Sequence, residues 1–163
     1  MMAISLLLLT TAASSQAEET ITIHERFNRL ICAGLCLDFD LVVRSGGSVE
    51  YRRRMVFSET WDPPRRYQIT PAEYRDFASR LRPIRPKGDS IPQKKCGGDM
   101  VRPHIFLWDI AWSGGSPSRL RACGDTPRVQ ESIGSAMKSL RIQSATGWRL
   151  SAKEAAKLDD RFW

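Results

Sequence analysis

The alternating pattern of residues 37–57 constrains the fold more than any other segment. Apolar side chains stand at odd positions and charged ones at even positions on both sides of Gly46-Gly47. A period of two is typical of strands with one buried face, so the segment predicts a β-hairpin. A two-residue loop would pair odd positions with even ones and place Leu41 opposite Arg52 on one face. We therefore expect an odd-length loop, most simply three residues, with a glycine at positive φ.

That loop length determines which side chains meet across the hairpin. It places Leu41 beside Tyr51 or Arg53. It also sets the two aspartates Asp38 and Asp40 against the consecutive arginines of residues 52–54, which are then largely paired.

Three further segments have strand patterns. Thr20–Phe27 alternates apolar and polar side chains, which predicts one buried face. His104–Trp112 is apolar at both odd and even positions, so we expect it at the centre of the sheet. After the turn Ser113-Gly114-Gly115-Ser116, the chain returns as Ser118–Cys123.

Two helix starts are marked by Thr-Pro pairs. Thr70-Pro71-Ala72-Glu73 is a capping box with proline in the first turn, and Pro83 is expected to end that helix. Thr126-Pro127 opens a second helix, and Ser151-Ala152-Lys153-Glu154 predicts a short terminal one. The expected core stripes are Tyr74, Phe77, Ala78 and Leu81 in the first helix and Val129, Ile133, Ala136, Met137 and Leu140 in the second.

The element order indicates an α+β fold. After one strand, strand–SGGS–strand–helix occurs twice, which suggests two ββα units, although chance repetition of common turn chemistry explains it equally. We expect an antiparallel sheet of about five strands with two helices packed on one face, plus the short C-terminal helix. The domain is predicted to span residues 18–145, followed by a C-terminal tail of residues 146–163.

Residues 1–17 resemble a signal peptide. They carry no charge, hold an apolar run from Ile4 to Leu9, and end in Ser15-Gln16-Ala17 before two glutamates. The run is too short for a bilayer, and no other stretch could span one. A buried N-terminal helix is the alternative. We expect cleavage after Ala17 and a soluble periplasmic or secreted product.

Export changes the expected role of the cysteines. In an oxidising compartment an even set of cysteines predicts disulfides, and three pairings are possible. The spacing favours Cys32–Cys36 across a tight corner and Cys96–Cys123 across a longer loop. Thiol chemistry is less favoured, because the C-x-x-x-C spacing differs from the redox motif C-x-x-C. We predict no metal site and no cofactor.

The segment Cys32-Ala33-Gly34-Leu35-Cys36, followed by the alternating strand and its aromatic-bearing return strand, resembles the domain of unknown function 6438 family. The family pattern is C-x-G-x-C-P-x-Y, and this chain departs from it at Leu37, Gly46 and Arg52. The resemblance covers about residues 20–142. It implies an envelope-exported α+β domain and no assigned reaction.

The residues provide no complete catalytic set, so we predict no catalytic residue. His24 and His104 are the two candidate bases, and no G-x-S-x-G, H-E-x-x-H or P-loop motif is present. Asp109 is the acid whose apolar neighbours could raise its pKa, although a buried acid bonded to backbone or to an arginine is the favoured interpretation. A small hydrolase or isomerase using Asp109 and His104 is therefore the alternative to a binding protein.

Positive charge is the remaining functional signal. The chain has 25 Lys and Arg against 18 Asp and Glu, for a net charge of +7. Basic side chains gather after the first helix, and we expect anion binding there, with a contribution from the loop at Trp61. We expect an anionic lipid, an envelope glycan or an acidic protein as partner and no nucleic acid, with a solvated loop and a secreted enzyme inhibitor as the other interpretations. The predicted anion-binding residues are Arg82, Arg85, Lys87, Lys94 and Lys95.

Overall fold

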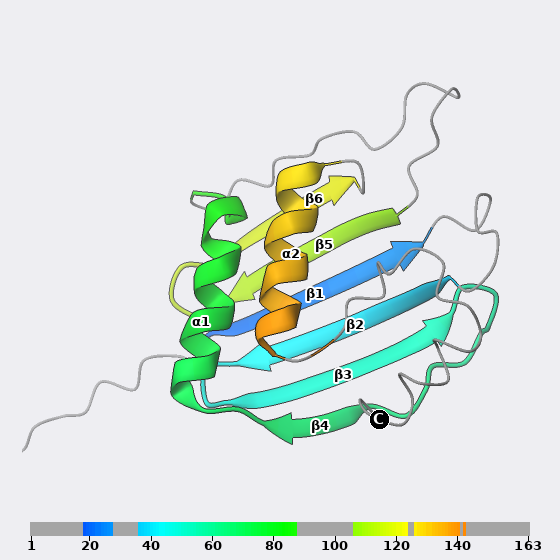
Figure 1. Cartoon of the computed structure of the whole chain (residues 1–163), viewed down its shortest axis with the longest axis horizontal. Coiled ribbons are helices and arrows are strands. Elements are labelled where there is room, and N and C mark those ends of the chain that lie inside the picture. The colour runs from blue at the N-terminus through cyan, green and yellow to red at the C-terminus, as the bar shows by residue number, and fades with distance from the viewer. Residues whose placement is uncertain (1–17, 28–35, 88–105, 124–125, 141, 143–163) are drawn as a thin grey trace, which may run out of the picture.

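The computed structural model describes residues 18–27, 36–87, 106–123, 126–140 and 142, which form one six-stranded sheet and two helices (Figure 1). All neighbouring strands are antiparallel, and their order is β4-β3-β2-β1-β5-β6. The strands are β1 (Thr20–Phe27), β2 (Leu37–Arg44), β3 (Ser48–Met55), β4 (Arg65–Gln68), β5 (Phe106–Ser113) and β6 (Ser118–Cys123). The helical elements are α1 (Pro71–Leu81), the 3-10 helix η2 (Arg82–Ile84) and α2 (Pro127–Ser139). The predicted α+β class is confirmed.

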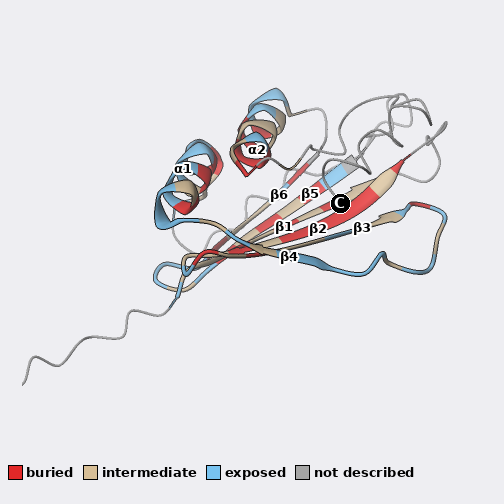
Figure 2. Cartoon of the chain, turned by 60° about the horizontal axis from the view of Figure 1, so that its bottom comes forward, coloured by how far each residue is buried: buried red, intermediate tan, exposed pale blue. Residues whose placement is uncertain are grey.

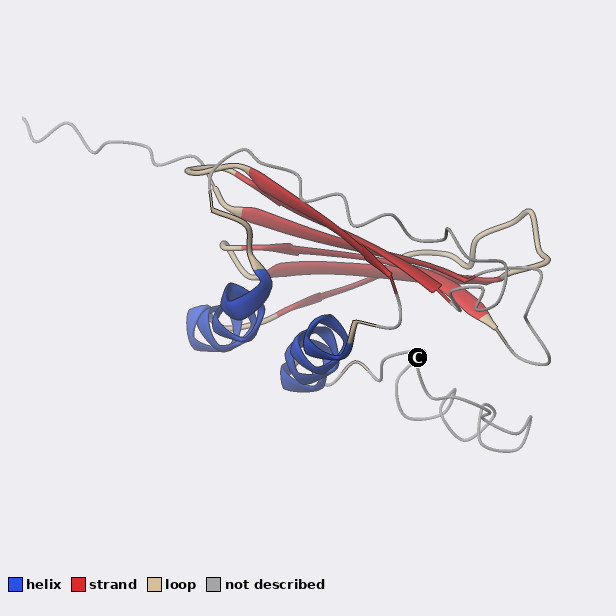
Figure 3. Cartoon of the chain, turned by 90° about the horizontal axis from the view of Figure 1, so that it is seen from above, coloured by secondary structure: helices blue, strands red, loops and turns tan. Residues whose placement is uncertain are grey.

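Both helices cover the same face of the sheet, as predicted, and they lie over the part where β1 begins (Figures 1 and 3). Their buried sides point at the strands (Figure 2). The core between the layers joins odd positions of β1–β3 and even positions of β5 to the predicted helix stripes. Its largest fully buried apolar side chains are Trp108, Phe39, Phe77, Ile21, Ile23, Leu41, Leu81, Ile110, Ile133 and Met137. Arg80 Nη1 of α1 donates to Ser135 Oγ of α2 at 2.7 Å, which ties the two helices together.

The hairpin between β2 and β3 has the predicted register. Val43 pairs with Val49, so the loop is the three residues 45–47, and Leu41 lies opposite Tyr51. Gly47 has φ 90° and its N–H donates to the Arg44 carbonyl at 2.8 Å. A Cβ at Gly47 would stand 2.3 Å from the Ile69 carbonyl oxygen, so both its φ and its surroundings require glycine.

The start of α1 is also as predicted. Thr70 Oγ1 accepts from the Glu73 N–H, and the Glu73 carboxylate accepts from the Thr70 N–H, which completes the capping box. The helix ends at Leu81, two residues before Pro83, because the last turn tightens into η2. Thr126 precedes α2 but makes no capping hydrogen bond with its side chain.

Two expectations about the sheet are wrong. The sheet has six strands and not about five. The sequence did not predict the edge strand β4, because its four residues are too few and too polar to show a periodic pattern. In addition, β5 is not central but lies next to the edge strand β6, and one of its faces is open. Leu107 on that face is 38% exposed, so its apolar character does not indicate burial.

Other sequence expectations fall outside the described residues. These are the leader at 1–17 and the short helix expected from Ser151. Among the helices of the described ranges, none combines the length and the apolar character needed to cross a membrane.

Candidate functional site

The face of the sheet that the helices leave uncovered, here called the open face, carries the charged side chains of the strands. It presents even positions of β1–β3 and odd positions of β5 and β6, and no described helix packs on it (Figure 3). Two groups of charges stand out. The Asp40 cluster comprises His24, Arg26, Asp38, Asp40, Arg52, Arg54 and Trp61, and the Asp109 cluster comprises Asp109, Arg119 and Arg121.

Asp40 is the centre of the first cluster. Its Oδ1 lies 2.5 Å from His24 Nδ1 and 2.6 Å from Arg26 Nη2, and its Oδ2 lies 2.8 Å from Arg52 Nη2. The Asp40 side chain is 5% exposed. Burial works to raise its pKa, but the bonds from His24, Arg26 and Arg52 outweigh burial, so the pKa of Asp40 lies well below its usual range. This carboxylate is therefore ionised and serves to fix its cationic neighbours.

Asp38 and Trp61 complete this cluster. Asp38 Oδ2 lies 2.9 Å from Arg54 Nη2, and its Oδ1 accepts from the Phe27 N–H at 2.8 Å. Trp61, in the β3–β4 loop, lies against three guanidinium groups. The guanidinium carbons of Arg26, Arg52 and Arg54 are 4.9, 4.6 and 4.8 Å from its ring centroid. Such cation–π contacts restrict the arginines without neutralising them.

The Asp109 cluster repeats the arrangement near the opposite edge of the sheet. Arg119 holds both carboxylate oxygens of Asp109, through Nε at 2.7 Å and Nη2 at 2.5 Å, and Arg121 Nε lies 3.1 Å away. Burial of Asp109 works to raise its pKa, but hydrogen bonds and charge from both arginines lower it overall. The suggestion that apolar neighbours raise the pKa of Asp109 is therefore wrong. Of the favoured interpretation, the bond to an arginine is confirmed, while the side chain is only partly buried, with 18% of its surface exposed.

Strand register joins the two clusters in one row. Arg52 is opposite Asp40, Asp40 opposite His24, His24 opposite Asp109, and Asp109 opposite Arg121. The row crosses β3, β2, β1, β5 and β6 in that order. Cations thus stand at both ends of a row whose carboxylates lie between them.

Charge pairing dominates the chemistry of this face. The pKa values of Asp40 and Asp109 are lowered and their oxygens are held by arginines, so these two residues are poor general acids. His24 is oriented by Asp40, but no serine, threonine or cysteine of the described residues bonds to its ring. The arginines Arg26, Arg52, Arg119 and Arg121 keep between 36% and 45% of their side-chain surface exposed. Each of these side chains therefore stays in contact with solvent while a carboxylate holds its guanidinium group.

In the predicted basic loop, Arg85 is bound to other parts of the domain. Arg85 Nη1 lies 2.8 Å from Glu19 Oε1, Arg85 Nη2 donates to the Ser116 carbonyl at 2.8 Å, and its guanidinium lies over Trp112. This arginine therefore ties η2 to β1 and to the β5–β6 turn. Arg82 and Lys87 are exposed at the surface. Lys94, Lys95 and His104 lie outside the described residues.

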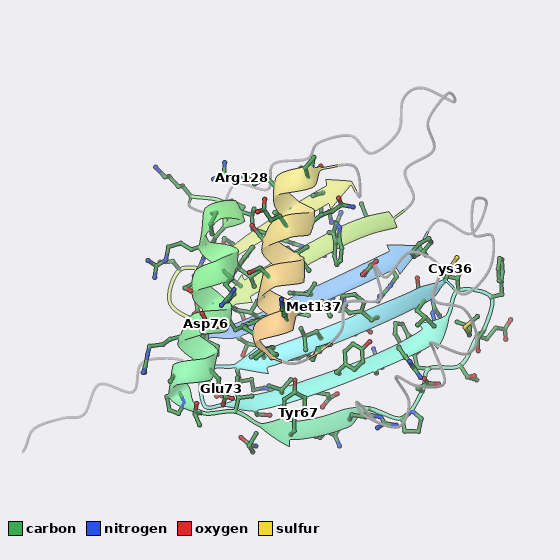
Figure 4. The ribbon with its side chains drawn as sticks, viewed as in Figure 1. Cys36, Tyr67, Glu73, Asp76, Arg128 and Met137 are labelled. Carbon is green, nitrogen blue, oxygen red and sulfur yellow. The ribbon has the colours of Figure 1, made fainter. Side chains whose placement is uncertain are left out.

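The described cysteine Cys36 is disulfide-bonded, and it lies at the start of β2, beyond the helices (Figure 4). Its partner is not among the described side chains. Cys32 and Cys96 lie outside the described residues, and for Cys123 only the backbone in β6 is described. The pairing of the four cysteines therefore stays a prediction. The described residues contain no group of three or more His, Cys, Asp or Glu side chains that could hold a metal ion.

Glu25 is a residue that sequence reasoning missed. It lies on the helix-covered face of β1, is 0% exposed, and pairs in register with Phe39 and Trp108. Neither carboxylate oxygen has a hydrogen-bond partner among the described residues. Burial, and secondarily the charge of Asp38, raise its pKa well above the usual value. Its odd position, in phase with Ile21 and Ile23, was the available signal.

No protein-family model, no curated protein and no solved structure matches the chain. The resemblance of residues 32–51 to the domain of unknown function 6438 family stays a prediction. Function is therefore inferred from the chemistry of the open face.

Proposed function

We propose that the protein is a non-catalytic binding domain that holds an anionic partner on its open face. One observation carries this proposal: the carboxylates of Asp40, which is buried, and Asp109, which is partly buried, hold the arginines of both clusters in place, while the guanidinium groups stay partly exposed. Side chains that are ordered before binding lose less conformational entropy when a ligand arrives. A guanidinium presented in this way suits carboxylate, sulfate or phosphate groups.

The proposal differs from the initial expectation in the location of the binding surface. Arg85 is held by Glu19 and Ser116, which leaves less of its guanidinium for a ligand. The loop after α1 is therefore a secondary contributor, through Arg82 and Lys87. Trp61 belongs to the proposed surface because it lies against three of its arginines.

Export and disulfides belong to the same proposal. A chain cleaved after Ala17 would act in the periplasm or outside the cell, where lipid headgroups, envelope glycans and acidic proteins are the accessible anions. Nucleic acid is not expected there. The proposed mature domain, residues 18–145, needs no cofactor for such a role.

The test compares loss of charge on the two faces. The protein is passed over immobilised polygalacturonate, polyglutamate and phosphatidylglycerol vesicles at increasing salt. The Arg52→Gln/Arg121→Gln variant removes two charges from the open face and leaves each aspartate another arginine partner. The control, Arg75→Gln/Arg128→Gln, removes two exposed charges from α1 and α2 (Figure 4).

We expect at least one anion to bind, with retention that weakens as salt increases. The open-face variant should bind about tenfold more weakly, or about 1.4 kcal/mol, and the control should bind nearly as the natural chain does. Thermal melts establish that both variants fold. Equal losses in the two variants, or no binding to any of the three anions, would contradict the proposal.

A further inference from the structure

We infer that the partner of the open face is a linear polysaccharide bearing carboxylate groups, which crosses the strands and contacts both clusters at once. This inference rests on the proposed function and specifies its ligand. It combines the spacing of the clusters, the side chains between them and the shape of the sheet.

The spacing comes from the strand register. Arg52 and Arg121 lie in the same cross-strand row, four strand intervals apart. Neighbouring strands are about 4.8 Å apart, so the backbones at the two ends of the row are separated by about 19 Å. A single small anion cannot reach both ends, whereas a polymer with repeated anionic groups can.

The neighbouring row carries short, uncharged side chains on its three middle strands, with Glu50 and Arg119 at its two ends. Val42, Thr22 and Ala111 are successive register partners across β2, β1 and β5, and each is partly exposed. Thr20 and His24 flank them on β1. This strip offers small side chains, hydroxyl groups and an imidazole, which suit the hydroxyl groups of sugar units between two acidic ones.

The shape of the sheet argues against a membrane surface. Adjacent strands are rotated by about 20–25° on average, so four intervals accumulate about 80–100° between β3 and β6. The twist is plain when the sheet is seen from above (Figure 3). A planar bilayer could therefore contact one cluster but not both, whereas a flexible chain can follow the twisted row.

The available contacts also argue against an acidic peptide. The large apolar side chains exposed in the described residues are Met55, Phe57 and Leu107. Leu107 lies opposite Arg26, beside the row that joins Arg52 to Arg121, and none of the three stands in that row. The backbone groups of the inner strands are already paired within the sheet. A peptide would thus find neither apolar pockets nor free backbone partners along the row. A carboxylated sugar chain needs only the guanidinium pairing that Arg119 already makes with Asp109.

The test measures affinity against ligand length. Oligogalacturonates of increasing length are titrated into the full-length mature protein by calorimetry at fixed ionic strength. Short oligomers should bind one cluster weakly. Affinity should then rise by about a hundredfold once an oligomer spans both clusters, because the second contact becomes intramolecular.

Single-site variants identify the two contacts. Arg121→Gln should abolish the rise with length and leave the weak binding of short oligomers at the Asp40 cluster. Arg52→Gln should also abolish the rise, with the Asp109 cluster retained. Arg128→Gln on α2 should leave the rise unchanged.

The outcomes separate this inference from the proposed function. Affinity that depends on Arg52 and Arg121 but not on length would overturn the bridging and leave an anion-binding face. Tighter binding to polyglutamate of matched length, or to phosphatidylglycerol vesicles, would overturn the polysaccharide and retain the proposed function. Absence of binding to all three anions would overturn both.

Discussion

At the residue scale, the two faces of the sheet around β1 shift the pKa values of buried acids in opposite directions. On the open face, Asp40 of the neighbouring strand is surrounded by His24, Arg26 and Arg52, and its pKa is lowered. On the covered face, Glu25 is buried against apolar side chains, finds no hydrogen-bond partner in the described part of the chain, and has a raised pKa. Burial acts on both acids, so nearby cations decide the direction of the shift.

Glu25 makes a prediction about stability and pH. Because its pKa is higher in the folded than in the unfolded state, the folded chain binds more protons at pH values between the two. The free energy of unfolding therefore falls as pH rises through that window, by about 1.4 kcal/mol for each pH unit. The Glu25→Gln variant removes this group's titration. It should gain stability over the natural chain progressively from pH 5 upward.

Urea unfolding at several pH values measures this difference. Glu59→Gln, at an exposed position of the β3–β4 loop, is the matched control and should keep the slope of the natural chain. If Glu25→Gln and the natural chain lose stability in parallel from pH 5 to 8, Glu25 is ionised in the folded protein and the prediction is wrong.

At the element scale, the N-termini of the two helices allow the stabilising effect of a helix cap to be measured. Both begin with Thr-Pro, yet Thr70 accepts a hydrogen bond from Glu73, while the buried Thr126 hydroxyl has no partner within the described ranges. Thr70→Ala should therefore cost about 1 kcal/mol of unfolding free energy. Thr126→Ala should cost less than about 0.5 kcal/mol, since it removes no capping bond.

Denaturant unfolding of the two variants gives both values. Equal destabilisation by the two alanines would show that the capping bond of Thr70 contributes nothing. The two Thr-Pro starts also differ in sequence. Glu73 stands three residues after Thr70, whereas Val129 stands three residues after Thr126 and cannot complete a capping box.

The same scale explains how much of the fold was predictable. Periodicity identifies β1, β2 and β3, and the parity of the loop at Gly47 predicts that β2 pairs with β3 so that Asp38 and Asp40 face the arginines of residues 52–54. The structure resolves these into Asp38 with Arg54 and Asp40 with Arg52. The pattern of β5 could not reveal its place near the edge, because strand order is a property of the whole sheet. β4 was missed since four largely exposed residues show no alternation of burial.

Only those contacts of the candidate site that lie within one hairpin could be predicted from the sequence. The aspartate–arginine pairs of one hairpin follow from its register. The contact of His24 with Asp40 and the alignment of Asp109 with His24 require β1 to lie between β2 and β5. Trp61 reaches the arginines through the course of the β3–β4 loop, which no periodic pattern encodes.

At the scale of the whole molecule, the apolar core and the charged surface lie on opposite faces of the sheet. The helices and the covered face hold the apolar core, so we expect removal of charges from the open face to leave that core intact. This division allows the charge variants above to be interpreted as changes in binding.

The last prediction concerns the N-terminus and the free thiols of an exported chain. Cys36 is disulfide-bonded, and four cysteines in an exported chain should leave no free thiol. Mass spectrometry without reduction should find a chain that begins at Glu18 and takes up no alkylating agent, whereas after reduction it should take up four groups. Reduction should lower the free energy of unfolding by about 2–5 kcal/mol.

A product that begins at Met1 with four reactive thiols would contradict export. The anion-binding face would then act in the cytoplasm, where an envelope polysaccharide is absent and the ligand proposed above could not be its partner.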